Sequence, residues 1–297
     1  MEIEEILKRQ DVKALKEAIN HGVDISKVKS IDFIFEVKEI DFTFLKILID
    51  NGININEKDE IGYLLFSCIF GENEEEKTII RDEAFLKYFI EFIMKNNNIE
   101  KDFFEEILEE ITLLGKIEII QIMIDNGFDI NYYFDGISLL AFACMFSDIK
   151  LVEFYLAYGA DVKKTFIMGE VSVNILIWSV MASQIMKTNK MQKLIIDKQK
   201  QHKMIKENSP IILKLLIQEG ANVNFTDSNN LSVLMYACLF SDIEMIEILI
   251  KNGADVNYNL RNMSLLGFIL LLTEKGFEQI MFNENFGKLD EDKVFFH

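Results

Sequence analysis

The chain has 297 residues, half of them hydrophobic, and a formal net charge of −18 at pH 7. An acidic body of that size repels the phosphates of DNA and RNA, so no nucleic-acid partner is expected. The N-terminal residues MEIEEILKRQD have neither the basic nor the apolar region of a secretory signal. The longest apolar run, residues 265–272, is far shorter than the roughly 20 residues that span a bilayer. We therefore expect a cytoplasmic protein without membrane insertion, or an effector exported by a signal-independent route.

Pairs of helix-length apolar segments recur along the chain, and each pair ends at a glycine or an asparagine. The closing residues are Gly22, Gly52, Asn97, Gly127, Gly159, Gly220 and Gly253. Glycine and asparagine both tolerate the left-handed conformation at a helix C-terminus, so Asn97 fits the series. The spacings of 30, 45, 30, 32, 61 and 33 residues indicate repeats with two insertions. In chain order we predict repeats at 1–29, 30–59, 60–103, 104–135, 136–170, 171–229 and 230–261, and a partial C-terminal cap at 262–297.

The two long repeats differ in the charge of their insertions. Repeat three has a glutamate-rich excess at residues 71–81, which we interpret as a solvated loop. Repeat six has a basic insert at 187–208, in which residues 187–206 contain seven lysines and one acid. The insert can be a solvated extension of two helices, a docking element for an acidic partner, or a segment folded into the chain's own groove. Ser209 and Pro210 then predict the start of the next helix, with serine as its N-cap.

A repeat of about 33 residues with two helices and a turn resembles the ankyrin-repeat family. The family's GADVN closure matches at residues 159–162 and 253–257, and loosely at 220–224. Its TPLHxA opening is eroded at 138–143, 174–179, 232–237 and 264–269, so we expect its Thr/His hydrogen-bonding pair to be absent. The resemblance implies an all-α solenoid, in which helix-turn-helix repeats stack and are joined by β-hairpin-like loops. It also implies a single domain over 1–297 and a non-enzymatic, monomeric protein-binding module.

In that family the two residues before the corner between the helices face the concave groove. Here all twelve residues at these positions are apolar. The pairs are Ile69-Phe70, Leu113-Leu114, Met145-Phe146, Met181-Ala182, Leu239-Phe240 and Leu271-Leu272. One interpretation is an apolar groove for an amphipathic helix of a partner protein. The other is that the phenylalanines fill volume between neighbouring helices.

Aromatic residues also follow the asparagines that close several repeats. They are Tyr132, Tyr133, Phe134, Phe225 and Tyr258. Aromatic side chains at loop tips are common in protein interfaces, and they can equally stiffen the loops that carry them. Both possibilities remain open from the sequence.

No residue pattern predicts catalysis, a metal or a cofactor. The three histidines, His21, His202 and His297, lie in different repeats, and the phosphate-binding and hydrolase motifs are missing. Cysteines 68, 144 and 238 occupy one position in three repeats, which predicts buried thiols too far apart for a disulfide. Two alternative functions remain: an acidic inhibitor, decoy or immunity-type protein that neutralises a basic protein, and a carrier of apolar ligands.

Overall fold

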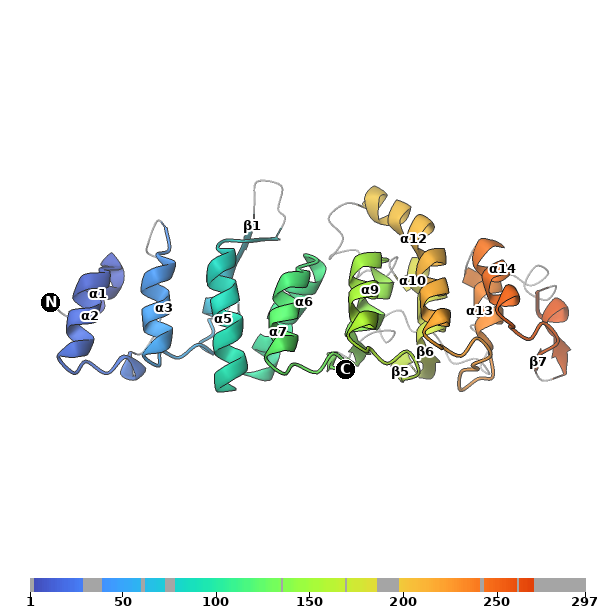
Figure 1. Cartoon of the computed structure of the whole chain (residues 1–297), viewed down its shortest axis with the longest axis horizontal. Helices are drawn as coiled ribbons and strands as arrows, with labels where there is room; N and C mark the ends of the chain where they lie inside the picture. Colours follow the sequence, from blue (N-terminus) through green and yellow to red (C-terminus); the bar gives the residue numbers. More distant parts are fainter. Residues whose placement is uncertain are drawn as a thin grey trace. The chain divides into compact units, whose positions relative to one another are not determined.

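The computed structural model describes residues 3–28, 39–59, 62–72, 78–134, 136–168, 170–185, 198–240, 243–260 and 262–269. They belong to two compact units, unit 1 (Met1–Phe128) and unit 2 (Asp129–His297). In both units short helices lie side by side and small hairpins lie at their ends (Figure 1). Residues 187–197 of the basic insert and residues 270–297 of the C-terminal cap, including Leu271 and Leu272, lie outside the described residues.

Unit 1 consists mainly of helices. Its elements are α1 (Ile3–Arg9), α2 (Val12–Asn20), η1 (Ile25–Lys27), α3 (Phe42–Asp50), α4 (Leu64–Ile69), β1 (Phe70–Glu72), β2 (Thr78–Ile80), α5 (Glu83–Asn96), α6 (Lys101–Leu113) and α7 (Ile117–Asp125). Helix α7 packs against both α5 and α6. Because α6 begins at Lys101, the repeat boundary expected between residues 103 and 104 falls inside a helix.

Unit 2 alternates helix pairs with short hairpins. Its elements are β3 (Tyr133–Phe134), β4 (Ile137–Ser138), α8 (Leu139–Met145), α9 (Ile149–Ala157), β5 (Thr165–Met168), β6 (Val171–Asn174), α10 (Ile175–Ile185), α12 (Lys198–Gln218), α13 (Val233–Phe240), α14 (Ile243–Lys251), β7 (Asn259–Leu260) and β8 (Met263–Ser264). Residues 265–269 are helical. The strands pair as antiparallel hairpins, β3 with β4, β5 with β6 and β7 with β8.

The helices of unit 2 form two layers. The first helices of successive repeats, α8, α10 and α13, pack in one row with α10 in the middle. The second helices α9, α12 and α14 form the other row, and α12 contacts both of its neighbours. The first helices are apolar on nearly every side, as expected for helices that are covered on most of their surface.

Polar side chains begin the helices. Ser138, Asn174 and Ser232 precede α8, α10 and α13, and the side-chain oxygen of each accepts the backbone N–H three residues further on. These residues stand where the eroded opening motif has its threonine. The N-capping half of the expected missing pair is therefore retained by serine and asparagine.

The repeat closures have the predicted backbone conformation. The six closing glycines have φ between 84° and 91°, and Asn97 has φ 49° at the end of α5. Two residues after each closing glycine, an Asp or Asn side chain accepts the backbone N–H of the residue two positions later. These residues are Asp24, Asn54, Asp129, Asp161, Asn222 and Asp255.

The last asparagine of the closure joins one repeat to the next. The amide of Asn224 donates to the Gly253 carbonyl at 2.9 Å and accepts from the Asp255 N–H at 2.8 Å. In unit 1, Asn56 donates to the Asn98 carbonyl and accepts from the Glu100 N–H. The closing motif therefore fixes the spacing of neighbouring loops as well as the end of a helix.

The acidic insertion of repeat three differs from the expected loop. Its flanks form the antiparallel hairpin β1–β2, with Phe70 opposite Ile80, and residues 73–77 lie outside the described residues. Arg81 closes this hairpin, because its Nε donates to the carbonyls of Ser67 and Phe70 at 3.2 Å each. A Cβ at Gly71 would lie 2.7 Å from the Arg81 guanidinium carbon, so a larger residue there would displace the guanidinium.

The predicted helix start at Ser209 and Pro210 is wrong. Helix α12 begins at Lys198 and continues through Pro210 to Gln218. Ser209 is 5% exposed, and its hydroxyl lies 3.2 Å from that of Ser147. The amide of Asn208 donates to the Ser147 carbonyl at 2.8 Å. These contacts hold Asn208 and Ser209 against the corner between α8 and α9, so Ser209 does not act as an N-cap.

All three cysteines are free thiols. Cys68 and Cys144 are buried, as predicted, whereas Cys238 is half-buried. Burial raises the pKa of the Cys68 thiol to about 12 and also raises the pKa values of Cys144 and Cys238. These side chains therefore pack as small apolar groups.

Candidate interaction surface

The predicted groove residues differ in exposure. Ile69, Phe70, Met145, Met181 and Ala182 are buried, with exposed fractions of 5% or less. The remaining described members are half-buried, and these are Leu113, Leu114, Phe146, Leu239 and Phe240. The apolar pairs therefore do not form a uniformly exposed strip. Among the described groove residues of unit 2, those accessible to a partner are Phe146, Leu239 and Phe240.

Each phenylalanine of the groove pairs with the aromatic residue four positions earlier in the chain. Ring centroids are 4.9 Å apart for Phe142 and Phe146 on α8, and 6.0 Å apart for Tyr236 and Phe240 on α13. In unit 1, Phe66 on α4 and Phe70, the first residue of β1, also form a pair, with ring centroids 4.7 Å apart. A separation of four residues places both rings on one face of a helix. The first ring of each pair on α8 and α13 is buried and supports the second, which stays half-exposed.

Tyr236 is anchored by a buried carboxylate that the sequence interpretation missed. Its hydroxyl donates to Asp227 Oδ2 at 2.7 Å, and Asp227 Oδ1 accepts from the N–H groups of Asn229 and Leu231. Burial raises the pKa of Asp227, although these hydrogen bonds oppose the rise, and burial also raises the pKa of Tyr236. The Asp-Ser-Asn-Asn run at 227–230 is a turn pattern that could have revealed this role. The contact joins the loop 226–232 to helix α13.

Trp178, the single tryptophan, joins α10 to α8. It is fully buried, and its Nε1–H donates to the Ala141 carbonyl at 2.8 Å. The ring of Phe166 packs edge-on against it with centroids 5.0 Å apart. The middle helix of the row is therefore fixed to its neighbour and to the hairpin β5–β6, which gives the surface a rigid base.

Two of the loop aromatics, Tyr133 and Tyr258, contact neighbouring loops. Tyr132, Tyr133, Phe225 and Tyr258 are half-buried, and the side chain of Phe134 lies outside the described residues. Lys164 Nζ lies 5.5 Å from the Tyr133 ring centroid, and the Tyr258 hydroxyl donates to the Asn230 carbonyl at 3.0 Å. Tyr133 and Tyr258 therefore stiffen the row of loops, and part of each ring stays accessible.

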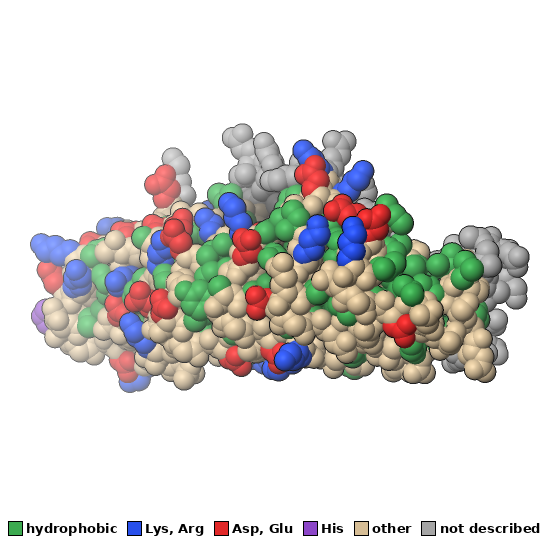
Figure 2. Space-filling model, turned by 45° about the vertical axis from the view of Figure 1, so that its right-hand side comes forward, with side chains coloured by type: hydrophobic (Ala, Val, Ile, Leu, Met, Phe, Trp, Pro, Cys, Tyr) green, Lys and Arg blue, Asp and Glu red, His purple; other side chains and the backbone are tan. Residues whose placement is uncertain are grey.

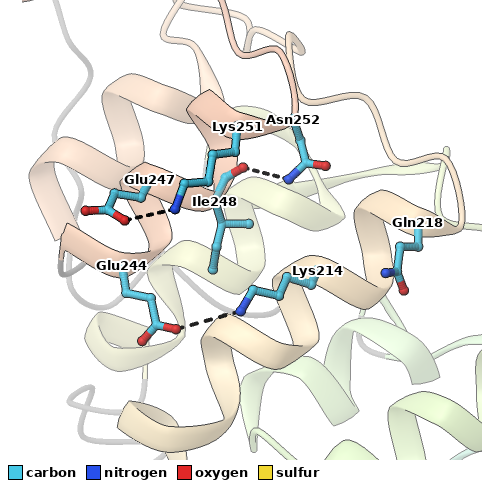
Figure 3. A pocket seen from close by; sticks show the side chains of 7 residues that line it. All are labelled: Lys214, Gln218, Glu244, Glu247, Ile248, Lys251 and Asn252. Carbon is cyan, nitrogen blue, oxygen red and sulfur yellow. Dashed lines mark hydrogen bonds and ion pairs between the residues drawn. The ribbon is translucent and has the colours of Figure 1, made fainter.

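A recess lies between the second helices α12 and α14. It has a volume of about 280 Å³ and is lined by Lys214, Gln218, Glu244, Glu247, Ile248, Lys251 and Asn252 (Figure 3). Lys214 lies 3.8 Å from Glu244, and Lys251 lies 3.2 Å from Glu247. Both lysines are thus already paired with carboxylates, and we name this feature the helix recess.

On the face drawn in Figure 2, acidic and basic side chains lie next to one another, with hydrophobic groups among them. One carboxyl group of unit 1 is unusual, because burial, with a smaller contribution from Glu109, raises the pKa of Glu110 to about 7. Within the described ranges, no three His, Cys, Asp or Glu side chains gather as metal ligands would. In the same part of the chain no helix is long and apolar enough to cross a membrane.

Paired helices in two rows, with hairpins between the pairs, define a helical repeat scaffold. A family model described as ankyrin repeats (3 copies) matches residues 169–266, which include α10, α12, α13 and α14. Residues 169–266 therefore resemble ankyrin repeats, and the mostly helical structure fits an all-α repeat solenoid. Ankyrin repeats are generally protein–protein interaction modules and are typically non-enzymatic. No curated protein matches the chain.

Proposed function

We propose that the chain is a monomeric, cytoplasmic protein-binding module that takes an amphipathic helix of its partner on the first-helix row of unit 2. The observation that carries the proposal is the recurrence of a supported, half-exposed phenylalanine at the end of α8 and of α13, Phe146 and Phe240. Leu239 lies beside Phe240 and is also half-buried. Rigid aromatic anchors above a packed base are typical of interface hot spots.

The buried members of the groove pairs act beneath this surface. Met145 and Met181 are buried, and their flexible thioether side chains can adjust when the apolar face of a helix binds. The half-buried Leu113 and Leu114 of unit 1 offer a second apolar contact of the same kind. In this account Ile69 and Phe70 support the fold of repeat three and do not contact the partner.

In this proposal the aromatic residues of the closing loops form the rim of the binding surface. Tyr132, Tyr133, Phe225 and Tyr258 present accessible ring edges from loops that already contact one another. Little conformational entropy is lost when a partner meets groups that are already ordered. The rim therefore supports binding by preorganisation.

The net charge of −18 adds a preference for basic partners. Electrostatic attraction of this kind raises association rates and weakens as salt is added. It also favours the alternative function, an acidic inhibitor or decoy that neutralises a basic protein mainly by charge. Salt separates the two, because burial of apolar groups persists at an ionic strength that screens exposed charges.

The decisive experiment compares matched substitutions on opposite faces of one repeat. Phe240→Asp places a charge on the proposed surface, and Ile250→Asp makes the same kind of change on α14, where the isoleucine is 45% exposed. Each variant and the parent are used to capture protein from a native lysate at low and moderate salt. Circular dichroism and Trp178 fluorescence verify that both variants are folded.

We expect the parent and Ile250→Asp to retain one protein at both salt concentrations, and Phe240→Asp to lose it by about tenfold or more. Capture that disappears at moderate salt for all three proteins would favour the charge-based decoy. Equal capture by a folded Phe240→Asp variant would contradict the proposed surface. If Phe240→Asp unfolds, Leu239→Asp provides the same test at the neighbouring position.

A further inference from the structure

A second hollow lies between the closing loops of repeats six and seven. Its volume is about 270 Å³, and we name it the loop hollow. It is lined by Val223, Asn224, Ser232, Leu234, Asp255 and Tyr258. These residues come from two successive closing loops and from the beginning of helix α13.

Hydrogen bonds fix the walls of the loop hollow. Asn224 bonds to the Gly253 carbonyl and to the Asp255 N–H, which holds the two loops at a set spacing. The Tyr258 hydroxyl is bonded to the Asn230 carbonyl, so its ring is held at the edge. Leu234 is 2% exposed and provides an apolar floor. The hollow is therefore preformed.

Asp255 is the carboxylate that lines the loop hollow, and only one of its two oxygens accepts a hydrogen bond from the described residues. Asp255 Oδ1 accepts the Asn257 N–H at 2.8 Å, whereas Oδ2 has no hydrogen-bond partner in the described part of the chain. No described lysine or arginine forms an ion pair with Asp255 either. The helix recess has no such unpaired carboxylate, because its glutamates Glu244 and Glu247 already form ion pairs with Lys214 and Lys251.

We propose that the loop hollow receives a lysine or arginine side chain of the bound protein. The methylene groups of such a side chain pack on Leu234 and Val223, and its cation meets Asp255 Oδ2 beside the Tyr258 ring. A long basic side chain fits this lining, because its charge pairs with the carboxylate while its methylene groups pack on the apolar floor. The volume admits one such side chain, and the net charge of −18 favours its approach.

This inference rests on the proposed function, because it names a feature of the same partner. Leu234 and Phe240 are six residues apart on α13, which is roughly 9 Å along the helix axis. A partner that covers Phe240 can therefore place a basic residue in the loop hollow. The partner would carry a lysine or arginine about two helical turns from its apolar anchor.

The test removes the charge of Asp255 by a substitution to asparagine, the residue that already occupies the equivalent position of repeat six. At the position equivalent to Asp255, repeat six has Asn222, whose Oδ1 accepts the Asn224 N–H in the same turn at 2.9 Å. Asp255→Asn should therefore preserve the loop and remove only the charge. The matched control is Asp161→Asn, because Asp161 forms the same turn with Lys163 and does not line the loop hollow.

The probes are the blocked tripeptides acetyl-Ala-Lys-Ala-amide and acetyl-Ala-Arg-Ala-amide, with the norleucine tripeptide as an uncharged analogue. Binding is followed by backbone amide NMR shifts in the full-length chain. We expect saturable shifts centred on Asn257 and Tyr258 with the two basic probes and none with norleucine. Asp255→Asn should weaken binding about fivefold or more, and Asp161→Asn should leave it unchanged.

Shifts spread over the acidic surface, an equal loss in the two variants, or no saturable shift would each overturn the loop hollow as a cation site. The Phe240→Asp variant keeps this outcome separate from the proposed function. Probe binding that survives Phe240→Asp while no protein is captured by the parent would retain the cation site and refute the groove. Protein capture by the parent without probe binding at Asp255 would retain the groove and refute the cation site.

Discussion

Replacing Asn224 with alanine removes the side chain that joins the closing loops of repeats six and seven. The substitution deletes two hydrogen bonds, one to the Gly253 carbonyl at 2.9 Å and one from the Asp255 N–H at 2.8 Å. A typical hydrogen bond contributes about 0.5–1.5 kcal/mol net. Asn224 is exposed, so water compensates part of this loss, and we expect about 1–2 kcal/mol in total.

Urea unfolding followed by Trp178 fluorescence and by circular dichroism measures this effect, because Trp178 is the single tryptophan and is fully buried in α10. In a unit of this size the corresponding change in Tm is roughly 2–4 °C per kcal/mol. The matched control is Gln218→Ala, which alters an exposed side chain in the same repeat and should change stability by less than about 0.5 kcal/mol.

An Asn224→Ala variant as stable as the parent would refute the idea that the closing asparagine couples the repeats. So would an equal loss in Gln218→Ala. Because a solenoid is stabilised by contacts between nearest neighbours, the fluorescence and circular dichroism transitions should also separate in Asn224→Ala if coupling is lost. Coincident, unshifted transitions in the variant would exclude that role.

Three more outcomes concern burial and backbone geometry. The raised pKa of Glu110 means that the folded chain binds this proton more tightly than the unfolded chain. Relative to Glu110→Gln, the parent should therefore lose stability as the pH rises from about 4.5 to about 7, and equal urea midpoint differences below and above that range would contradict this. Thiol reagents should label Cys238 before Cys144, and the opposite order would contradict their burial. Pro210→Ala should stabilise α12 by about 1–3 kcal/mol, because it restores a helical N–H, and a loss in thermal unfolding would instead support a helix start at this proline.

The sequence predicted the features that depend on local chemistry. Positive φ at the closing residues depends on steric freedom at one position, so Asn97 could be assigned correctly among six glycines. The helix pairs follow from apolar periodicity, which is also local. The all-α solenoid fold is therefore predictable from the sequence.

Features that depend on distant contacts were not accessible. A Ser-Pro pair is a good local helix start, yet Ser209 and Asn208 are held by Ser147, some sixty residues earlier in the chain. The polar bond between Asp227 and Tyr236 depends on how a loop folds back on a helix. The local sequence around Ser209 favours an N-cap, and the local sequence around Asp227 does not identify Tyr236 as its partner. Both outcomes depend on tertiary packing, which a local pattern does not contain.

The exposure of the groove pairs illustrates the same limit. Met145 and Met181 occupy the same position of the repeat as Leu239, but the methionines are buried and the leucine is half-buried. Exposure depends on how neighbouring helices pack, and equivalent positions in a degenerate repeat have different neighbours. Which members of the pairs contact a partner therefore stays a proposal that rests on the geometry of unit 2.

Site-specific photo-crosslinking tests the central claim most directly. A benzoylphenylalanine is placed at Phe240 in one variant and at Ile211 in another, where the native side chain is 44% exposed on α12. After irradiation in native lysate, the account predicts one protein crosslinked through position 240 and not through position 211. A crosslink through position 211 alone, or equal labelling through both positions, would contradict binding on the first-helix row of unit 2.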